Sequence, residues 1–558
     1  MKIISIGNYL SNINSNKVFK FLIISILALG IFFRFVHLDK KVFWYDETFT
    51  SLRVSGYTYV EAEAKLKQKT AANDVITVED LQQYQTFQPE NGLKGLLNGL
   101  IKEEAQLSPL YFMAVQSWVR LLGDSISVTR SVSAFASLLT LPAIYWLSQL
   151  LFNSPGVSWS AVALIAVSPF HVLYAQEARP SSWLTLFVLL SSATFLKAVQ
   201  SGKKLNWAIY AVTLSLGYYT HLNIIILAAG HCIYILFNKK FWHKKILFSY
   251  FGASLVSLIL FVPWLIALYI NLSSAQKMTS WLSDDVSIKS LVKAWLLNIN
   301  RLFIDFNYAF VYADLLSYLS ITLTTLLVGY SIYFIIRSTQ KQTWSFVIII
   351  IAINVLPLLL PDLIFGGKRS AIARYLIIAY LGIQLAVAYL IARLIFNLHI
   401  KKSYQTFWRV VAGSLVSLSI ISCLTLSQTD AWWNKLSSFD IPKVAAILNQ
   451  TKNSLVICQG VIPFDLNHSL KSNIYFLYPN SKKQNNFTEY EFENQILDSY
   501  KNIFVFSHSV DSSSLLDYVI KVSSNLRIAK EYTWRRYHDP TFFSVIKLWQ
   551  LERRNGTN

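Results

Sequence analysis

The sequence predicts an α-helical polytopic membrane protein with a small α/β domain at its C-terminus. Three observations support this fold class. The 558-residue chain is 54% hydrophobic and 14% charged, with a mean hydropathy of +0.41, whereas soluble domains carry about 25% charged residues. Apolar stretches long enough to cross a bilayer recur between residues 18 and 427. After residue 428 the composition becomes that of a soluble protein.

About eleven apolar segments have roughly the 17–25 residues that a membrane-spanning helix needs. They occupy 18–36, 128–151, 157–174, 181–199, 205–220, 222–237, 246–270, 313–336, 343–361, 372–396 and 407–427. The first segment is long and lacks a small-residue cleavage signature near its end, so we expect a retained signal anchor. A further stretch, 109–122, is shorter and contains Arg120. We expect it to lie in the plane of the membrane surface.

The basic residues predict the orientation of the chain. If 109–122 does not cross, every strongly basic short loop except one lies on the same side as the N-terminus, and the positive-inside rule makes that side cytoplasmic. Orientation and anionic lipid then explain the net charge of +20 better than nucleic acid does. The predicted extracytoplasmic parts are 37–127, 174–182, 218–223, 271–312, 361–374 and the tail from 428.

The predicted domains are a transmembrane domain, 1–427, and a soluble α/β domain, 428–558. Within the first, the extracytoplasmic loop 37–127 carries juxtamembrane helices, one of which starts after Thr77 as N-cap with Asp80 three residues on. The tail alternates short β-rich runs with helical stretches, including "SLVICQG", "NIYFLYP", "KNIFVFSH" and "FFSVIKLW". It has no Gly-rich phosphate loop. The three cysteines lie far apart and indicate no zinc site or disulfide framework.

Asp46 and Glu47, in "VFWYDETFT" just after the first span, are the strongest candidates for chemistry. A carboxylate held at a membrane surface is costly and indicates function. It could act as the general base that takes a proton from an acceptor hydroxyl, while its neighbour positions the acceptor or binds a divalent metal. The alternative interpretation is that the two acidic residues only stabilise the first turn of a helix, where negative charge is favoured.

Two turns on the same predicted face carry further polar residues. "SPFHVLYAQEARPSS" contains Gln176, Glu177 and Arg179, and the planar guanidinium of Arg179 suits phosphate oxygens. Alternatively, Arg179 is an interfacial anchor neutralised by Glu177. "YYTHLN" adds His221, which could equally be an interfacial polar residue.

The turn "GGKRSAIARY" supplies Lys368, Arg369 and Arg374, followed by Tyr375. It is the strongly basic short loop on the face where positive charge is disfavoured. A lipid phosphate that binds there is the simplest reason, although contact with bulk anionic headgroups is the alternative. Aromatic residues such as Tyr111 could contact substrate, but they more often form interfacial belts.

Taken together, these motifs resemble the membrane-embedded GT-C glycosyltransferases of the protein O-mannosyltransferase and lipid A aminoarabinose transferase type. The matching pieces are "WYDET", the run "PLYF…W…LLGDS…TRSVSAF" (109–135), "SPFHVLYAQEAR", "YYTHLN" and the late "ARY". The chain differs where relatives commonly have His-Pro-Pro or Lys-Pro-Pro, since it has Leu107, Ser108 and Pro109. It also has Pro180 and Ser181 where a tyrosine is frequent after "QEAR".

The resemblance implies a glycosyltransferase that moves a hexosyl or pentosyl group from a polyprenyl-phosphate carrier to a lipid, glycan or protein acceptor, with inversion. Asp46 and Glu47 then match the catalytic residues. Arg179, Lys368, Arg369 and Arg374 match the site for the donor phosphate, and Gln176, Glu177, His221, Tyr375 and Tyr111 are substrate-binding candidates. The reaction is expected to need no metal or to depend on one weakly, and no nucleotide, because the donor is lipid-linked.

The expected location is the plasma membrane, with the N-terminus in the cytoplasm and the active site and C-terminal domain outside. One rival is a lipid-linked sugar flippase or transporter, but transporters show repeated halves and charged or broken spans near the midplane. Another rival is a polysaccharide polymerase or ligase of related fold.

Overall fold

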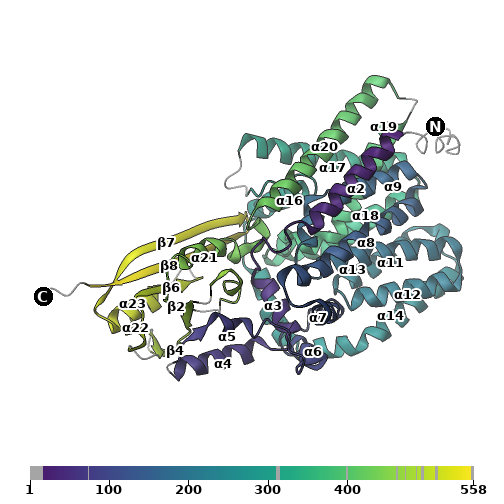
Figure 1. Cartoon of the computed structure of the whole chain (residues 1–558). Helices are drawn as coiled ribbons and strands as arrows, with labels where there is room; N and C mark the ends of the chain where they lie inside the picture. Colours follow the sequence, from purple (N-terminus) through teal and green to yellow (C-terminus); the bar gives the residue numbers. More distant parts are fainter. Residues whose placement is uncertain are drawn as a thin grey trace. The chain divides into compact units, whose positions relative to one another are not determined.

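Figure 1 shows the computed structural model of the chain, which divides into two compact units. The structure describes residues 17–72, 74–308, 314–397, 400–459, 463–471, 473–484, 487–491, 495–508 and 513–554. The membrane unit comprises residues 1–38, 104–114 and 127–428, and the sheet unit comprises 39–103, 115–126 and 429–558. The sheet unit therefore joins the C-terminal tail to most of the predicted first loop.

Helices occupy all eleven predicted apolar segments of the membrane unit. Their bounds are α2 (Lys17–Phe35), α8 (Ile126–Phe152), α9 (Pro155–Ala166) with α10 (Pro169–Ala175), α11 (Ser181–Ser201), α12 (Lys204–Tyr218), α13 (Asn223–Phe237), α14 (Lys244–Ile270), α17 (Leu315–Ser338), α18 (Lys341–Phe365), α19 (Ile377–Phe396) and α20 (Lys402–Gln428). Within the described residues, eight helices are long and apolar enough to cross a membrane, or nine if the bent pair α9–α10 is one span.

Two helices in predicted spans, and the helix in the predicted in-plane stretch, are shorter than a full crossing. α12 and α13 have 15 residues each, so the number of crossings stays a prediction. The predicted in-plane stretch forms α7 (Leu110–Leu122), whose 13 residues extend about 20 Å at 1.5 Å per residue. This is less than the roughly 30 Å of a bilayer's hydrocarbon core.

α19 is the central helix of the membrane unit. It packs against α9, α17, α18 and α20 and is almost entirely buried, as expected for a helix that is apolar on all sides. α14 differs, because apolar side chains such as Phe248, Leu255 and Ile259 are exposed. Such a surface is suited to lipid, so the unit is built as a bundle around α19 with apolar outer helices.

The bend between α9 and α10 places the 176–180 turn that follows. The two helices meet at 57°, and Pro169 starts α10. The completely buried side chain of Arg34 donates to the carbonyl oxygens of Ile165 and Ala166 at distances of 3.1 and 2.5 Å. It thereby satisfies carbonyls that the end of α9 leaves without helical partners.

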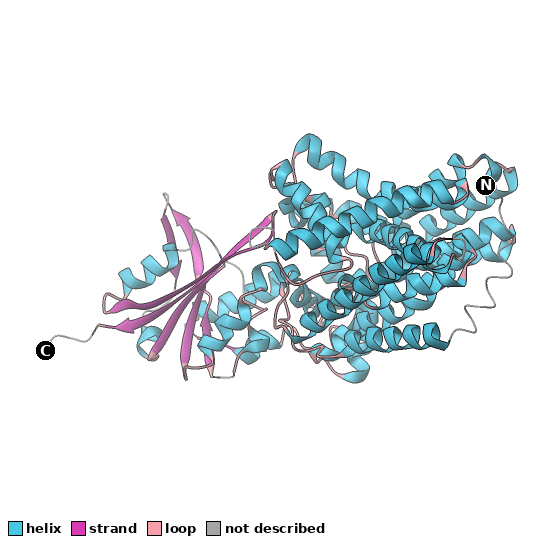
Figure 2. Cartoon of the chain, turned by 90° about the horizontal axis from the view of Figure 1, so that it is seen from above, coloured by secondary structure: helices cyan, strands magenta, loops and turns pink. Residues whose placement is uncertain are grey.

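The sheet unit contains a six-stranded mixed sheet in the order β1-β3-β2-β6-β8-β7, and Figure 2 shows the strands gathered in one part of the chain. The strands are β1 (Ile76–Thr77), β2 (Ser454–Gln459), β3 (Ile474–Leu477), β6 (Asn502–Ser507), β7 (Leu526–Asp539) and β8 (Phe542–Arg553). β4 (Asn480–Gln484) and β5 (Phe487–Glu491) form a separate pair. β2 pairs in parallel with β3 and β6, while β8 is antiparallel to β6 and β7.

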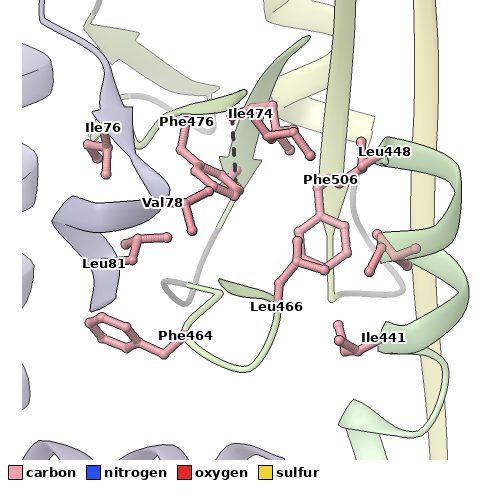
Figure 3. Packing of buried hydrophobic residues seen from close by; sticks show 14 of the residues in the cluster. Ile76, Val78, Leu81, Ile441, Leu448, Phe464, Leu466, Ile474, Phe476 and Phe506 are labelled. Carbon is pink, nitrogen blue, oxygen red and sulfur yellow. Dashed lines mark hydrogen bonds between the residues drawn. The ribbon is translucent and has the colours of Figure 1, made fainter. Parts of the chain in front are cut away.

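Alternating side chains of the central strands build two cores. Val456 and Phe504 face one apolar cluster, while Leu455 and Ile503 face the other, as the two-residue period of a strand requires. α21 (Ile441–Leu448), α4 (Tyr59–Ala71) and α5 (Val78–Gln82) cover the first face, and Figure 3 shows residues of α5 and α21 in this cluster. α22 (Gln495–Asp498) and α23 (Ser513–Val522) cover the second.

The first loop is helical, as predicted, and is built into this domain. It forms α3 (Tyr45–Val54), α4, α5 and α6 (Gly92–Glu103). The predicted cap of α5 is confirmed, since Thr77 accepts from the backbone N–H of Asp80 and forms a capping box with it. β1 precedes this cap and pairs with β3 of the tail. Two parts of the chain separated by more than 350 residues therefore share one sheet.

Candidate functional site

The candidate residues divide between the two units. Asp46 and Glu47 lie in the sheet unit. All the others lie in the membrane unit, namely Tyr111, Gln176, Glu177, Arg179, His221, Lys368, Arg369, Arg374 and Tyr375.

The two adjacent carboxylates have different surroundings. Both lie in the first turn of α3, where negative charge favours the helix. Glu47 is completely buried; its Oε2 lies 3.4 Å from the backbone N–H of Trp44 and 3.7 Å from Nζ of Lys435, which is completely buried too. Asp46 is only partly buried. The helix-start interpretation therefore describes Glu47, whereas Asp46 has the exposure that a base acting on an incoming hydroxyl needs.

The surroundings of this pair do not fit a divalent metal. Among the described residues, no group of three or more His, Cys, Asp or Glu side chains could hold a metal ion. Glu47 lies against an ammonium group, and a cation at the same oxygen would add repulsion.

In the membrane unit, Gln176 and Tyr111 support the backbone around Arg179. The Gln176 amide donates to the carbonyl oxygens of Phe33 and Val36, at 2.7 and 2.9 Å, and so caps the end of α2. The Tyr111 hydroxyl lies 3.1 Å from Oγ of Ser133, which donates to the Arg179 carbonyl at 3.1 Å. Both predicted substrate contacts are buried and fix the 176–180 turn.

His221 shares its surroundings with two arginines from separate turns. Burial, followed by the positive charges of Arg179 and Arg374, lowers the pKa of His221 to about 4. The backbone N–H of Asn223 lies 3.1 Å from its Nδ1, and an imidazole nitrogen accepts this bond only when it carries no proton. The imidazole is therefore neutral, and the net charge around it comes from the arginines. Glu177, two positions before Arg179 in the 176–180 turn, is buried.

Lys368 and Arg369 are ion-paired within the membrane unit. Nζ of Lys368 lies 3.0 Å from Oδ2 of Asp284, and Nη1 of Arg369 lies 2.9 Å from Oδ1 of Asp362. The Asp362 carboxylate also accepts from the backbone N–H and the hydroxyl of Ser370, both at 2.7 Å. These cations therefore help to fix the shape of the 366–375 turn.

The rest of this turn is fixed by backbone conformation and by amides. Gly367 has φ +122°, and a Cβ there would lie 2.8 Å from the backbone carbonyl oxygen of Leu282, so another residue would strain the turn. The Tyr375 carbonyl accepts from Nδ2 of Asn354 at 3.0 Å and of Asn223 at 3.4 Å. The Arg374 guanidinium lies 5.6 Å from the Tyr375 ring centroid. Tyr375 thus supports Arg374 through its ring and backbone.

Among the buried cations that sequence reasoning did not single out, two interact with candidate residues or their neighbours. Arg301, the last residue of α16 (Ile288–Arg301), is 1% exposed and donates to Oδ1 of Asn298 at 3.1 Å. It interacts electrostatically with Tyr174, as does Arg374. A basic residue that ends an amphipathic helix in the predicted 271–312 loop is a usable signal. Lys435, the partner of Glu47, lies in the tail, and no motif marks it.

Comparison with known proteins identifies the fold. Residues 107–266, less than half of the chain, match the family model described as dolichyl-phosphate-mannose-protein mannosyltransferase. The structure of ArnT from Cupriavidus metallidurans bound to undecaprenyl phosphate is 12% identical, with TM-score 0.50 over 96% of this chain and 98% of that chain. The fold is that of a GT-C glycosyltransferase. The resemblance inferred from the sequence motifs is thereby confirmed.

Two other solved structures are similar at lower scores. The Archaeoglobus fulgidus oligosaccharyltransferase is 12% identical, with TM-score 0.45 over 83% of this chain and 65% of that chain. The mycobacterial arabinofuranosyltransferase AftD is 11% identical, with TM-score 0.44 over 97% of this chain and 42% of that chain. A search of curated proteins finds no significant match.

The family match spans five of the candidate residues, namely Tyr111, Gln176, Glu177, Arg179 and His221. Asp46, Glu47 and the 368–375 residues lie outside it. Since structural likeness at this identity establishes the fold alone, the roles of all these residues rest on their chemistry.

Proposed function

We propose that this polytopic membrane protein transfers a sugar from a polyprenyl-phosphate-linked donor to a lipid, glycan or protein acceptor on the outer face of the plasma membrane. The observation that carries the proposal is that Asp46 is a partly exposed residue next to the fully buried Glu47, in a chain with a GT-C fold. Undecaprenyl phosphate, which is bound in the similar ArnT structure, is the carrier we propose.

In the proposed reaction, the acceptor hydroxyl attacks the anomeric carbon of the sugar. The bond from that carbon to the carrier phosphate oxygen breaks, and the electron pair leaves with the phosphate. Asp46 takes the hydroxyl proton as general base. Attack from the side opposite the phosphate inverts the anomeric centre.

The carrier phosphate changes from a diester with one negative charge to a monoester with a second one. Arg179 and Arg374 are the cations proposed to stabilise this charge, because they share the surroundings of the neutral His221. Lys368 and Arg369 are paired with carboxylates, so we propose that they act on the phosphate mainly by positioning Arg374.

The test is mass analysis of envelope lipids and glycans in cells that produce the wild-type protein, its Asp46→Asn variant or neither. We expect a sugar-modified product with the wild type alone, while purified wild-type and Asp46→Asn proteins bind undecaprenyl phosphate equally. The same product pattern in all three cell types would contradict the proposal. Movement of a lipid-linked sugar across the membrane without a transferred product would favour the transporter, and joined oligosaccharide units would favour the polymerase or ligase.

The proposed sidedness has a separate test. A cysteine placed in the 361–374 turn should react with an impermeant thiol reagent in whole cells, while one placed at Lys203 should react only after lysis. The reverse pattern would overturn the outer-face assignment.

A further inference from the structure

The segment that carries Asp46 is attached to the C-terminal tail at successive residues. The backbone N–H of Val42 donates to the Asp430 carbonyl at 2.8 Å. The Phe43 and His468 rings meet edge to face at 4.9 Å. The backbone N–H of Tyr45 donates to Oγ of Ser438 at 3.0 Å.

The last of these contacts, and two further ones, involve a short stretch of the tail, η7 (Trp433–Ser438). Ser438 also links this stretch to another part of the tail, because its hydroxyl donates to Oδ2 of Asp465 at 2.6 Å. Lys435 approaches Glu47 at 3.7 Å and lies 5.2 Å from the Trp44 ring centroid. η7 therefore touches the residues on both sides of Asp46.

Among these contacts, the Lys435–Glu47 ion pair is the one whose two side chains are both completely buried. Both side chains have 0% exposure. A buried charge pair is weak evidence for stability, because the cost of removing both charges from water offsets their attraction. It can still fix geometry, because a buried charge that moves away from its partner loses an attraction that surrounding water does not replace. Such a pair suits positioning better than stabilisation.

The backbone between Lys435 and Ser438 is strained. Leu436 has φ +46° and ψ −123°, a conformation that a residue with a branched side chain rarely adopts. Strain of this kind persists where the surrounding contacts impose it, and it is concentrated at functional sites. Here it lies between the two residues that contact the Asp46 segment.

We infer that Lys435 is a positioning residue that holds Asp46 in place through Glu47, which makes the C-terminal domain part of the catalytic apparatus. The inference rests on the proposed function and decides the role left open for Glu47. This carboxylate anchors the start of α3, so that Asp46 alone meets the acceptor.

The experiment compares Lys435→Met, Glu47→Gln and the double variant with wild type. Turnover is the amount of sugar-modified product in cells per amount of folded protein. Binding is the affinity of each purified protein for undecaprenyl phosphate. We expect each single variant to lose about 10²-fold in turnover, the loss that a misplacement of about 1 Å can cause, while affinity changes less than about twofold.

The double variant separates positioning from stability. It removes both buried charges, so its melting temperature should return toward that of wild type, while its turnover stays low. Lys435→Arg, which keeps the charge, should recover part of the turnover. Lys443→Met is the matched control, because Lys443 pairs with Asp440 in the same unit but is half exposed, and it should keep wild-type turnover.

Wild-type turnover in Lys435→Met or in the double variant would overturn the inference. Asp46→Asn, assayed in parallel, keeps the two proposals apart. If Asp46→Asn is inactive and Lys435→Met is fully active, the proposed function stands and the positioning role fails. If Asp46→Asn is active, the proposed function itself fails.

Discussion

Ion pairs hold both the acidic segment around Asp46 and the basic turn around Arg374, but the pairs differ in how completely they are buried. In the acidic segment the neighbour of Asp46 is sealed completely, because Glu47 and Lys435 are both fully buried. In the basic turn Arg369 meets the fully buried Asp362, whereas Lys368 meets Asp284, whose side chain is 62% exposed.

This difference in burial indicates that the backbone around Asp46 is held more firmly than the backbone around Arg374. A fully buried pair cannot loosen without leaving a charge uncompensated, whereas a pair with an exposed partner can exchange it for water. In both regions a buried ion pair holds the backbone, and we propose that Asp46 and Arg374, which lie close by in the sequence, meet the substrate. Four predictions test this division, starting with the largest effect.

The first concerns the base. Asp46→Asn should reduce transfer by about 10²–10⁴-fold, the contribution of a general base, because the amide cannot take a proton. Product formation per amount of folded protein measures the effect. Asp74→Asn is the control, since that side chain is exposed in the same unit. An equal loss in both variants would contradict the assignment.

The second concerns the buried acid of the basic turn. Asp362→Asn should lower stability by about 1.5–3 kcal/mol, because the Ser370 backbone N–H and hydroxyl lose a buried, charged acceptor. Asp284→Asn should cost less than about 1 kcal/mol, since its carboxylate is largely exposed. Unfolding of the purified proteins in detergent measures both. Similar losses would mean that the two pairs do not differ as described.

The third separates the cations of the turn. Arg374→Gln should weaken binding of undecaprenyl phosphate by about 10–100-fold, in line with about 1.5–3 kcal/mol for a hydrogen bond to a charged group. Lys368→Gln should weaken binding by less than about fivefold, because it disturbs Arg374 only through a pair whose partner, Asp284, is largely exposed. Calorimetric titration with undecaprenyl phosphate tests this, and the reverse order would assign the phosphate to Lys368.

The fourth and smallest effect is the pH dependence set by His221. Its pKa is lowered from 6.5 to about 4 by burial and by two arginines, so between these values the unfolded chain binds more protons. Stability should therefore fall as the pH drops from 6.5 toward 4. His221→Gln should lose about 2–4 °C less than wild type in melting temperature between pH 7.5 and 5. Parallel losses in both proteins would mean that His221 titrates normally.

The sequence by itself determined the helices of the membrane unit. Spans that meet lipid must satisfy their backbone internally, so length and hydrophobicity suffice to find them, and helices occur in all eleven predicted segments. The capping box at Thr77 and the strands β2, β3, β6 and β8 were likewise predictable, because local patterns determine them. The order and spacing of the motifs predicted the GT-C fold.

The tertiary structure alone decided which chain segments share a unit and which charges are sealed. β7 has a mostly polar, exposed surface, and β1 has two residues, so neither carries a strong apolar pattern. Burial of Glu47 depends on Lys435, 388 positions later in the chain, and nothing in either local sequence encodes that meeting. Whether a charged side chain binds substrate or holds the backbone depends on such long-range contacts, because they determine which charges are removed from water.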